Sequence, residues 1–357
     1  MRCNKELVEA LVLGGAVLGG GGGGYIEEGL KLGHLALEMG EPEILPLNAI
    51  DPEETVITVA AVGAPAAENR YLKPMDYVNA VKIVMEALRI SKCGLITNEM
   101  GGMASVNGLL QGAVLGLPVV DAPCNGRAHP TSLMGAMGLH KLPDYVAIQS
   151  AFGGHLTRGT RVELLVRGDI RRCSALVREA SVQAGGIVAV ARNPVQARYL
   201  SEHAAVGAMQ QAISLGEVIS QVERQGKSVE EEVARYLGGE VVAEGRVTHV
   251  QLTTEGGFDR GTVWIEGMYE LVFWNEYMLL EAQGERLYTF PDLITTFDMS
   301  THRPVTSAEI RKGMKVAIVV TRKEQLILGQ GMREPELFRV VENAISRPIV
   351  RYVFGGE

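Results

Sequence analysis

The chain has 357 residues, of which 46% are hydrophobic and 21% charged, and its formal net charge is −8. These values are typical of a globular protein large enough for two domains. The acidic balance and the lack of any Lys/Arg-rich run exclude a nucleic acid as the main partner. No apolar stretch is long and continuous enough to span a membrane.

The cysteines are widely spaced and form no CxxC pair; they are Cys3, Cys93, Cys124 and Cys173. This spacing predicts neither a disulfide framework nor a cysteine zinc site, and it favours a reducing, cytoplasmic location. Glu6 and Glu9 stand where a signal peptide would carry positive charge. We therefore expect no targeting segment.

The first part of the chain alternates between strand and helix patterns. Strands are expected at 43–47, 55–63, 93–99, 118–123 and 144–150, and helices at 25–39, 76–90 and 105–115. This alternation predicts an N-terminal α/β domain, residues 1–160, with a parallel sheet covered by helices. Residues 11–15 fit either a short strand or the end of a helix that begins at Lys5.

The second part predicts a mixed C-terminal domain, residues 161–357, with an α/β start. Its first elements are expected at 162–166 (strand), 171–183 (helix), 185–192 (strand) and 195–225 (a helical run). From about residue 238 the pattern becomes β-rich. Strands are expected there at 240–254, 261–267, 269–282, 293–299 and 315–321.

Six consecutive glycines, residues 19–24, precede the helix expected at 25–39. They match a dinucleotide fingerprint formally, but the strand at 43–47 ends in Leu47 and Asn48, without the acid that binds ribose. The Lys and Ser/Thr of a Walker loop are also absent. A flexible loop is the simpler alternative. We favour a wall of backbone N–H groups beside a helix start, with the following ligand-binding residues: Gly20, Gly21, Gly22 and Gly23.

Polar residues also follow two expected strands of the first domain, where open α/β sheets gather their binding sites. Asn98 and Glu99 end one strand, and Gly101 and Gly102 then allow close backbone approach. After the other strand come Asp121, Cys124, Asn125, Arg127 and His129. Such a density of reactive groups predicts a small-molecule site.

Several of these residues also have a structural interpretation. His129, which precedes Pro130, could be an ordinary residue at the N-terminus of a helix. Asp121 could cap a helix, and Arg127 could be a surface charge or pair with Glu99. Cys124 is more often an inert buried thiol than a nucleophile.

In the second domain, "GGFDRG" predicts a tight hairpin in which Asp259 and Arg260 could pair. Glu276 lies within an aromatic stretch, and period-2 alternation places it on the face of Trp274 and Met278. A carboxylate with apolar neighbours favours a cleft acid with a raised pKa. We therefore add Asp259 and Glu276 to the binding residues.

Six motifs in order carry a resemblance to a known family: "LGGGGGG", "NEMGG", "VVDAPCNGRAHP", "GGFDRGTVWIEG", "FWNEYMLL" and "FPDLITTFD". The chain resembles the S-methyl thiohydantoin desulfurase family. The resemblance implies an α/β N-terminal domain, a separate C-terminal domain, and a heterocyclic small molecule as substrate. It also implies work alongside ATP-dependent hydantoinase/oxoprolinase proteins. The alternative to an enzyme is a non-catalytic accessory subunit of such a partner. The sequence leaves open whether the chain forms a homo-oligomer.

For this substrate we expect water to attack the ring carbon that bears sulfur, with loss of methanethiol. Asp121 or Glu99 would be the base, and Asp121→Asn should then abolish turnover. Arg127 and the glycine N–H groups would stabilise the developing charge, and His129 would donate a proton. Covalent attack by Cys124, activated by His129, is the rival mechanism.

No cofactor is expected. A catalytic metal is not indicated, because the sequence has no HxH or HExxH pair. A metal group could arise only if the fold gathered Glu99, Asp121, His129 and His155.

Overall fold

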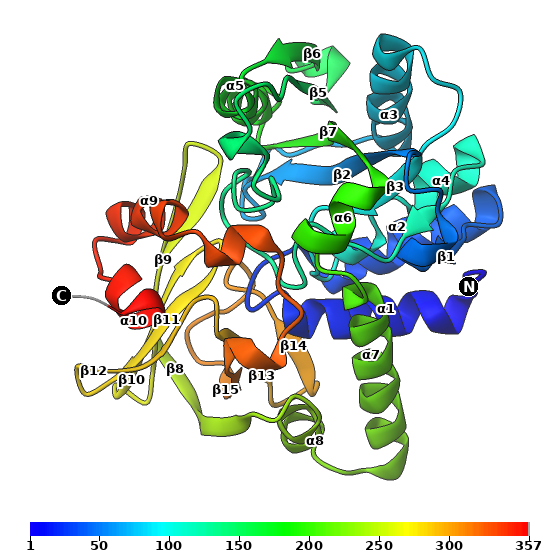
Figure 1. Cartoon of the computed structure of the whole chain (residues 1–357). Coiled ribbons are helices and arrows are strands. Elements are labelled where there is room, and N and C mark those ends of the chain that lie inside the picture. The colour runs from blue at the N-terminus through cyan, green and yellow to red at the C-terminus, as the bar shows by residue number, and fades with distance from the viewer. Residues whose placement is uncertain (356–357) are drawn as a thin grey trace.

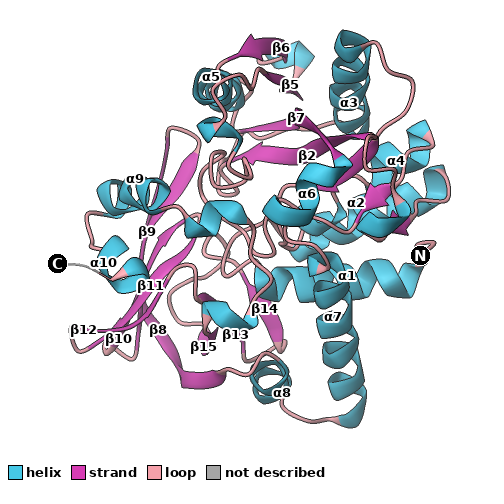
Figure 2. Cartoon of the chain, viewed as in Figure 1, coloured by secondary structure: helices cyan, strands magenta, loops and turns pink. Residues whose placement is uncertain are grey.

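The computed structural model describes residues 1–355 and contains two β-sheets. The blue-to-green part of the chain builds a seven-stranded sheet with helices around it, and the yellow-to-orange part builds an eight-stranded sheet (Figure 1). Colouring by secondary structure shows that helices surround the first sheet more fully than the second (Figure 2). Among the described residues, no helix combines the length and apolar character needed to cross a membrane.

The elements within residues 1–196 build the first sheet and its helices, and they follow the predicted alternation closely. The helices are α1 (Lys5–Leu18), α2 (Ile26–Met39), α3 (Pro74–Leu88), α4 (Leu109–Leu115) and α5 (Ile170–Gln183). The strands are β1 (Ile44–Leu45), β2 (Thr55–Gly63), β3 (Gly94–Thr97), β4 (Val119–Val120), β5 (Ala147–Gly153), β6 (Val162–Gly168) and β7 (Ile187–Gln196). Short 3₁₀ helices are η1 (Leu47–Ala49), η2 (Ala104–Val106), η3 (Leu139–Lys141) and η4 (Leu156–Arg158).

The first sheet has the order β1-β4-β3-β2-β7-β5-β6. Its first four strands are parallel, whereas β7 runs antiparallel to β2 and β5, and β6 runs antiparallel to β5. The predicted α/β class is confirmed. The domain boundary near residue 160 stays a prediction, although β6 and β7 follow that position and pair within this sheet.

Helices cover both faces of this sheet because side chains of a strand alternate in direction. Val59 of β2 packs in one cluster with Val81 of α3. Val62 of the same strand packs in another cluster with Val177 of α5. The apolar β2 sequence is therefore buried on both sides, as its composition predicts.

The chain before the glycines is a helix, not a strand, so the dinucleotide fingerprint lacks its preceding strand. Helix α1 crosses α7 (Ala208–Gln225) at glycines of both helices (Figure 1). A Cβ on Gly14 would lie 1.8 Å from the carbonyl oxygen of Ala212, and one on Gly216 would lie 1.9 Å from that of Ala10. The two backbones touch because neither glycine carries a side chain.

The second part contains the remaining helices and the antiparallel sheet. The helices are α6 (Ala197–His203), α7, α8 (Val229–Tyr236), α9 (Pro335–Ile345) and α10 (Val350–Phe354), with η5 (Lys323–Gln325) and η6 (Gln330–Arg333). The strands are β8 (Glu240–Glu255), β9 (Phe258–Ile265), β10 (Tyr269–Trp274), β11 (Glu276–Ala282), β12 (Glu285–Thr289), β13 (Leu293–Asp298), β14 (Arg303–Val305) and β15 (Lys315–Thr321). Their order is β12-β11-β10-β9-β8-β15-β13-β14.

Two details of this part differ from the sequence analysis. The helical run expected at 195–225 is interrupted between α6 and α7, where Gly207 has φ +90°. The strand expected at 269–282 is a hairpin, because Asn275 adopts a left-handed conformation (φ +59°) and reverses the chain between β10 and β11. The continuous strand predicted through Asn275 is therefore wrong. The predicted sharing of faces is confirmed, because Trp274 pairs with Glu276 and Phe273 pairs with Tyr277 across the hairpin.

Candidate functional site

A polar pocket lies where the first sheet, the glycine loop (residues 19–24) and the β10–β11 hairpin meet. Its volume is about 70 Å³. The ionisable groups in its wall come from distant parts of the sequence; they are Arg70, Glu99, His129, Arg178, Arg192 and Glu276. Because four of these groups are cationic or basic and two are acidic, the wall can both bind negative charge and exchange protons.

The glycine loop threads between the two sheets. The carbonyl of Gly20 accepts a 2.8 Å hydrogen bond from the N–H of Tyr277, and the carbonyl of Gly23 accepts bonds from Met103 and Ala104 at 3.0 and 2.9 Å. A Cβ on Gly21 would lie 2.6 Å from the Tyr277 ring. Glycine is therefore required by close packing against neighbouring chain, not only by the ligand.

Only part of the predicted glycine wall reaches the pocket. Gly23 and Gly24 line it, whereas Gly20, Gly21 and Gly22 pack most closely against Arg127, Tyr277 and Glu276, respectively. Within residues 1–355 the N–H groups of Gly23 and Gly24 donate no hydrogen bond. These two N–H groups are free donors beside the N-terminus of α2, where the helix dipole also favours negative charge.

Glu99 occupies the pocket wall directly after β3. Its Oε2 accepts hydrogen bonds from the backbone N–H of His129 at 3.2 Å and from Asn98 Nδ2 at 3.3 Å. Burial raises the pKa of Glu99 to about 7, and these hydrogen bonds and the nearby Arg192 only partly offset that effect. Glu99 thus changes protonation state near neutral pH, as a general base requires.

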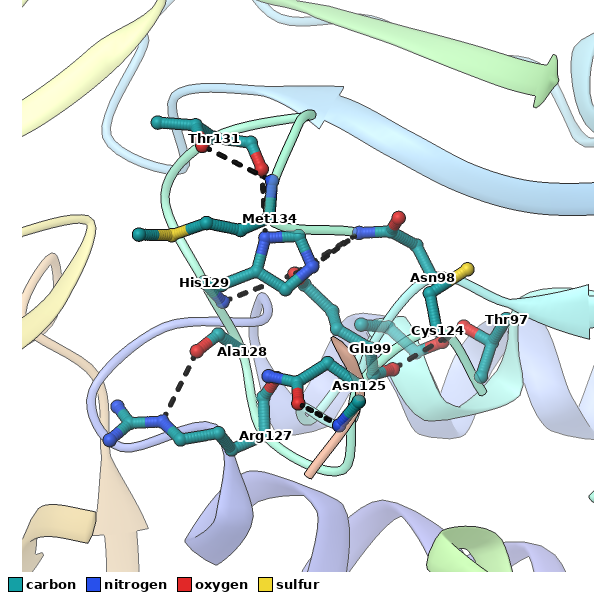
Figure 3. Close-up of polar contacts among 12 residues, drawn as sticks. Thr97, Asn98, Glu99, Cys124, Asn125, Arg127, Ala128, His129, Thr131 and Met134 are labelled. Atoms are coloured by element: carbon teal, nitrogen blue, oxygen red, sulfur yellow. Dashed lines mark hydrogen bonds and ion pairs between the residues drawn. The ribbon is translucent and has the colours of Figure 1, made fainter. Parts of the chain in front are cut away.

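A chain of hydrogen bonds fixes His129 in the neutral form (Figure 3). Arg192 Nη2 donates to Asn98 Oδ1 at 2.7 Å, so the amide NH₂ of Asn98 faces His129 Nε2 at 3.1 Å. His129 Nδ1 then donates to the carbonyl of Thr131 at 3.0 Å. Burial and the charge of Arg192 lower the pKa of His129 to about 3. The expectation that this imidazole titrates near neutrality is not met, because burial and the charge of Arg192 outweigh the nearby Glu99 carboxylate, whose Oε2 lies 3.4 Å from Nε2.

Glu276 is the second carboxyl group of the pocket and is 2% exposed. Its Oε2 makes no hydrogen bond within the described residues. Burial, and next the charge of Glu99, raise the pKa of Glu276 well above its ordinary value. The prediction of a buried carboxylate with a raised pKa is consistent with this environment, although the β10–β11 turn rather than strand alternation places it there.

Asp259 supports this turn from outside the pocket. Its backbone N–H donates to Asn275 Oδ1 at 2.9 Å, and its carboxylate accepts from Thr254 Oγ1 at 2.6 Å and from the N–H of Ala66 at 2.7 Å. The predicted β8–β9 hairpin is present, but Arg260 pairs with Glu255 instead of Asp259. Asp259 thus connects β9 to the loop after β2 by hydrogen bonds. Asn275 lines the pocket, whereas Asp259 does not.

Arg178 and Arg192 are pocket residues that the sequence analysis missed. Arg178 stacks on Phe258, with its guanidinium carbon 4.1 Å from the ring centre, and donates to the carbonyl of Gly257 at 2.9 Å. Burial lowers the pKa of both arginines. Arg192 Nε and Nη1 have no hydrogen-bond partner within residues 1–355. The available signal was Arg192 itself, a charged residue that directly follows the apolar run 187–191.

Asp121 and Cys124 follow β4 but do not line the pocket. Asp121 Oδ1 and Oδ2 accept from the N–H groups of Met209 (2.7 Å) and Gln210 (3.1 Å), which caps the start of α7. Cys124 is fully buried, its Sγ lies 3.4 Å from Thr58 Oγ1, and burial raises its pKa to about 11. Asp121 is therefore a helix-capping residue, and Cys124 is a buried thiol, as their structural interpretations predict.

Arg127 and Asn125 hold the loop together beneath the pocket. The Arg127 guanidinium stacks on Phe290 and donates to the carbonyl of Pro291 at 3.1 Å. It points away from His129 (Figure 3). Asn125 Nδ2 donates to the carbonyl of Arg127 at 2.8 Å, and Asn125 Oδ1 accepts from the N–H of Gly329 at 3.0 Å.

Gly101, Gly102 and His155 complete the predicted set. A Cβ on Gly101 would lie 2.3 Å from the Cα of Gly23, and one on Gly102 would lie 2.7 Å from the carbonyl oxygen of Gly24. Both glycines therefore support the glycine loop from behind. His155 shares a 2.8 Å hydrogen bond with Thr157 and does not line the pocket. The four residues considered as metal ligands from the sequence therefore do not come together among the described residues; they are Glu99, Asp121, His129 and His155.

Two family sequence models match most of the chain. The S-Me-THD-like N-terminal domain matches residues 6–155, and the S-Me-THD-like C-terminal domain matches residues 168–332. A search of curated proteins finds no match. A structural-genomics crystal structure of a protein from Chromobacterium violaceum shares the fold, with a TM-score of 0.69 and 21% identity over 100% of this chain and 98% of that chain. The chain therefore belongs to the S-Me-THD-like family, the S-methyl thiohydantoin desulfurase family that its motifs predict.

Proposed function

We propose that this protein is a hydrolase that converts an S-methyl thiohydantoin to a hydantoin and methanethiol. Family membership supports the substrate class. The observation that carries the proposal is the presence of two carboxyl groups in one small polar pocket: Glu276, which is buried, and Glu99, whose side chain is 17% exposed. Two coupled carboxyl groups whose environments separate their pKa values are suited to act as an acid and base pair.

Glu99 is the general base in this proposal. Its pKa of about 7 lets it accept a proton from water as the water oxygen attacks the ring carbon that bears the S-methyl group. The C=N double bond of the ring opens to a single bond, so negative charge develops on the ring nitrogen. The N–H groups of Gly23 and Gly24 and the guanidinium groups of Arg178 and Arg192, all from residues that line the pocket, would stabilise this charge.

Glu276 is the general acid. Burial, and next the charge of Glu99, raise its pKa well above the ordinary value, so we assign the proton to Glu276 in the state in which Glu99 is ionised. It donates its proton to the ring nitrogen. The added hydroxyl then loses its proton to the Glu276 carboxylate, the carbon–sulfur bond breaks, and methanethiolate takes the proton held by Glu99. The products are the hydantoin carbonyl and methanethiol, and both carboxyl groups regain their initial states.

The test measures methanethiol release with a thiol reagent and hydantoin by chromatography. We expect Glu276→Gln and Glu99→Gln each to lower kcat by at least ~100-fold, the contribution typical of a general acid or base. Glu163→Gln, which changes a carboxyl group that is 59% exposed and paired with Arg161, is the matched control and should retain wild-type turnover. Binding of the substrate without release of thiol by the wild-type protein would contradict the proposal and favour an accessory role beside a hydantoinase/oxoprolinase.

A further inference from the structure

A second ionisable cluster lies outside the pocket, between η3 and the start of α9. His140 Nε2 is 3.0 Å from Glu334 Oε2 and 4.0 Å from Glu336 Oε1. The three ligand atoms, one from each residue, all lie within 4.8 Å of one another. Tetrahedral zinc with bonds of about 2.0–2.2 Å holds its ligand atoms roughly 3.3 Å apart. The distances between the ligand atoms of this cluster lie on both sides of that value, so small side-chain movements would allow zinc to bind.

Two members of this cluster are buried and leave polar atoms without a hydrogen bond. The side chains of His140 and Glu334 are 0% and 1% exposed. Within the described residues, both ring nitrogens of His140 and Oε2 of Glu334 form no hydrogen bond, even though Nε2 and Oε2 approach to 3.0 Å. Buried polar atoms in a native protein almost always have a partner. Two such atoms that face each other at 3.0 Å are suited to share one bound ion.

Lys141 supplies the positive charge of this cluster in the metal-free state. Its Nζ lies 3.4 Å from Glu334 Oε2 and 3.0 Å from Glu336 Oε1. The Lys141 side chain is 48% exposed, so it can leave the two carboxylates without disturbing the core. The Lys141–Glu336 pair joins groups that are 48% and 44% exposed, and exposed pairs of this kind are weak. For the buried Glu334 carboxylate, a divalent ion would replace the positive charge that Lys141 provides.

We propose that His140, Glu334 and Glu336 form a binding site for a divalent transition-metal ion of the zinc class, which displaces the Lys141 ammonium. One imidazole and two carboxylates suit such an ion, and three protein ligands leave a fourth position for water. The ion would join η3 to α9, whose Phe338 packs with Val272 and Trp274 of β10. It would therefore stabilise the contact between the segment after His129 and the hairpin that carries Glu276.

Zinc chloride is the probe, added to the full chain after treatment with a chelator. Isothermal titration should show one strong site per chain, and Co²⁺ in its place should give the visible absorption bands of a low-coordinate nitrogen–oxygen site. Glu336→Gln, which changes a 44% exposed residue and should leave the fold intact, should weaken binding by more than ~100-fold, as should Glu334→Gln. Lys141→Gln should tighten binding about tenfold, because zinc no longer displaces two ion pairs.

His34→Asn is the matched control. His34 Nε2 lies 3.6 Å from Glu9 Oε1, and among residues 1–355 it belongs to no group of three metal-ligating side chains, so this variant should bind zinc like the wild type. If neither the wild type nor Lys141→Gln binds zinc at one site per chain, the cluster is an ion-pair network and the proposal is overturned. The same conclusion follows if Glu336→Gln and Glu334→Gln bind as tightly as the wild type. These outcomes do not depend on the proposed hydrolysis.

Discussion

Gly22 lies directly against Glu276: a Cβ on Gly22 would be 2.2 Å from Glu276 Oε1 and 2.6 Å from Glu276 Cγ. The backbone of the glycine loop therefore forms the surface against which the buried carboxyl group rests. Each neighbouring glycine has a similar contact, with Arg127 at Gly20, Tyr277 at Gly21 and Gly101 at Gly23. Six consecutive glycines allow this loop to pass between two sheets and still hold an acid in place.

Gly22→Ala should lower kcat/KM by at least tenfold, because the new methyl group displaces Glu276 from the pocket. Overpacking of this kind costs about 1–3 kcal/mol of stability. Gly116→Ala is the control, since a Cβ there meets nothing within 4 Å although φ is +66°. It should lose about 1 kcal/mol from backbone strain and keep its activity. Equal activity losses in both variants would show that Glu276 has no special dependence on Gly22.

The pH dependence of kcat/KM should be bell-shaped. Glu99 acts when ionised, so activity should rise with pH and level off above about 7, the pKa to which burial raises this group. Glu276 acts when protonated, so activity should fall again at higher pH, because burial and the charge of Glu99 raise its pKa. Steady-state assays from pH 5 to 10 test this profile. A plateau that already begins near pH 5 would rule out Glu99 as the base.

Much of the fold could be predicted because its signals are local. The apolar run of β2 and the 3.6-residue period of α2 each lie within one segment, and both elements have almost the predicted bounds. Residues 11–15 were ambiguous because a helix rich in glycine and β-branched residues lacks a clear polar face. The true α1 buries ten of its fourteen residues against other helices and strands.

The chemistry of the site could be predicted less well, because it depends on residues far apart in sequence. His129 receives its orientation through Asn98 from Arg192, which is 63 positions later. Asp121 caps α7 by accepting a hydrogen bond from the N–H of Met209, which is 88 positions away. A carboxylate or imidazole shows its type in the sequence, but burial and partners decide its pKa and direction. The sequence therefore indicates candidate residues more reliably than their roles.

Glu99→Gln should stabilise the fold at pH 8 and have little effect at pH 5. The pKa of Glu99 is about 7 in the folded state and 4.5 in its ordinary state. As pH rises between these values the unfolded chain loses this proton first, so the group lowers the free energy of unfolding. Glutamine avoids that cost and keeps an oxygen for the His129 N–H. Thermal unfolding at both pH values tests this, and Glu163→Gln should show no such difference. Lower stability at pH 8 would contradict the environment described for Glu99.

Asp121→Asn should reduce stability more than turnover. The carboxylate accepts two N–H groups at the start of α7, whereas an amide offers one acceptor and no charge, which costs about 1 kcal/mol. Asp169→Asn, at the start of α5, removes an equivalent cap and should lower the melting temperature similarly. Both variants should keep kcat within about twofold. If kcat falls by several orders of magnitude in folded Asp121→Asn but not in Asp169→Asn, Asp121 is the general base.

Cys124→Ser should keep kcat/KM within about threefold of the wild type. Cys124 is fully buried beside Thr58, and its pKa of about 11 leaves the thiol protonated at neutral pH, whereas nucleophilic attack requires the thiolate. His129 cannot activate it, because Asn98 and Thr131 already occupy both ring nitrogens. A serine hydroxyl retains the contact with Thr58, so only a modest loss of stability is expected. Methanethiol release should be measured beside Glu99→Gln at pH 8. If the serine variant is inactive and Glu99→Gln is active, the reaction proceeds through covalent attack by Cys124.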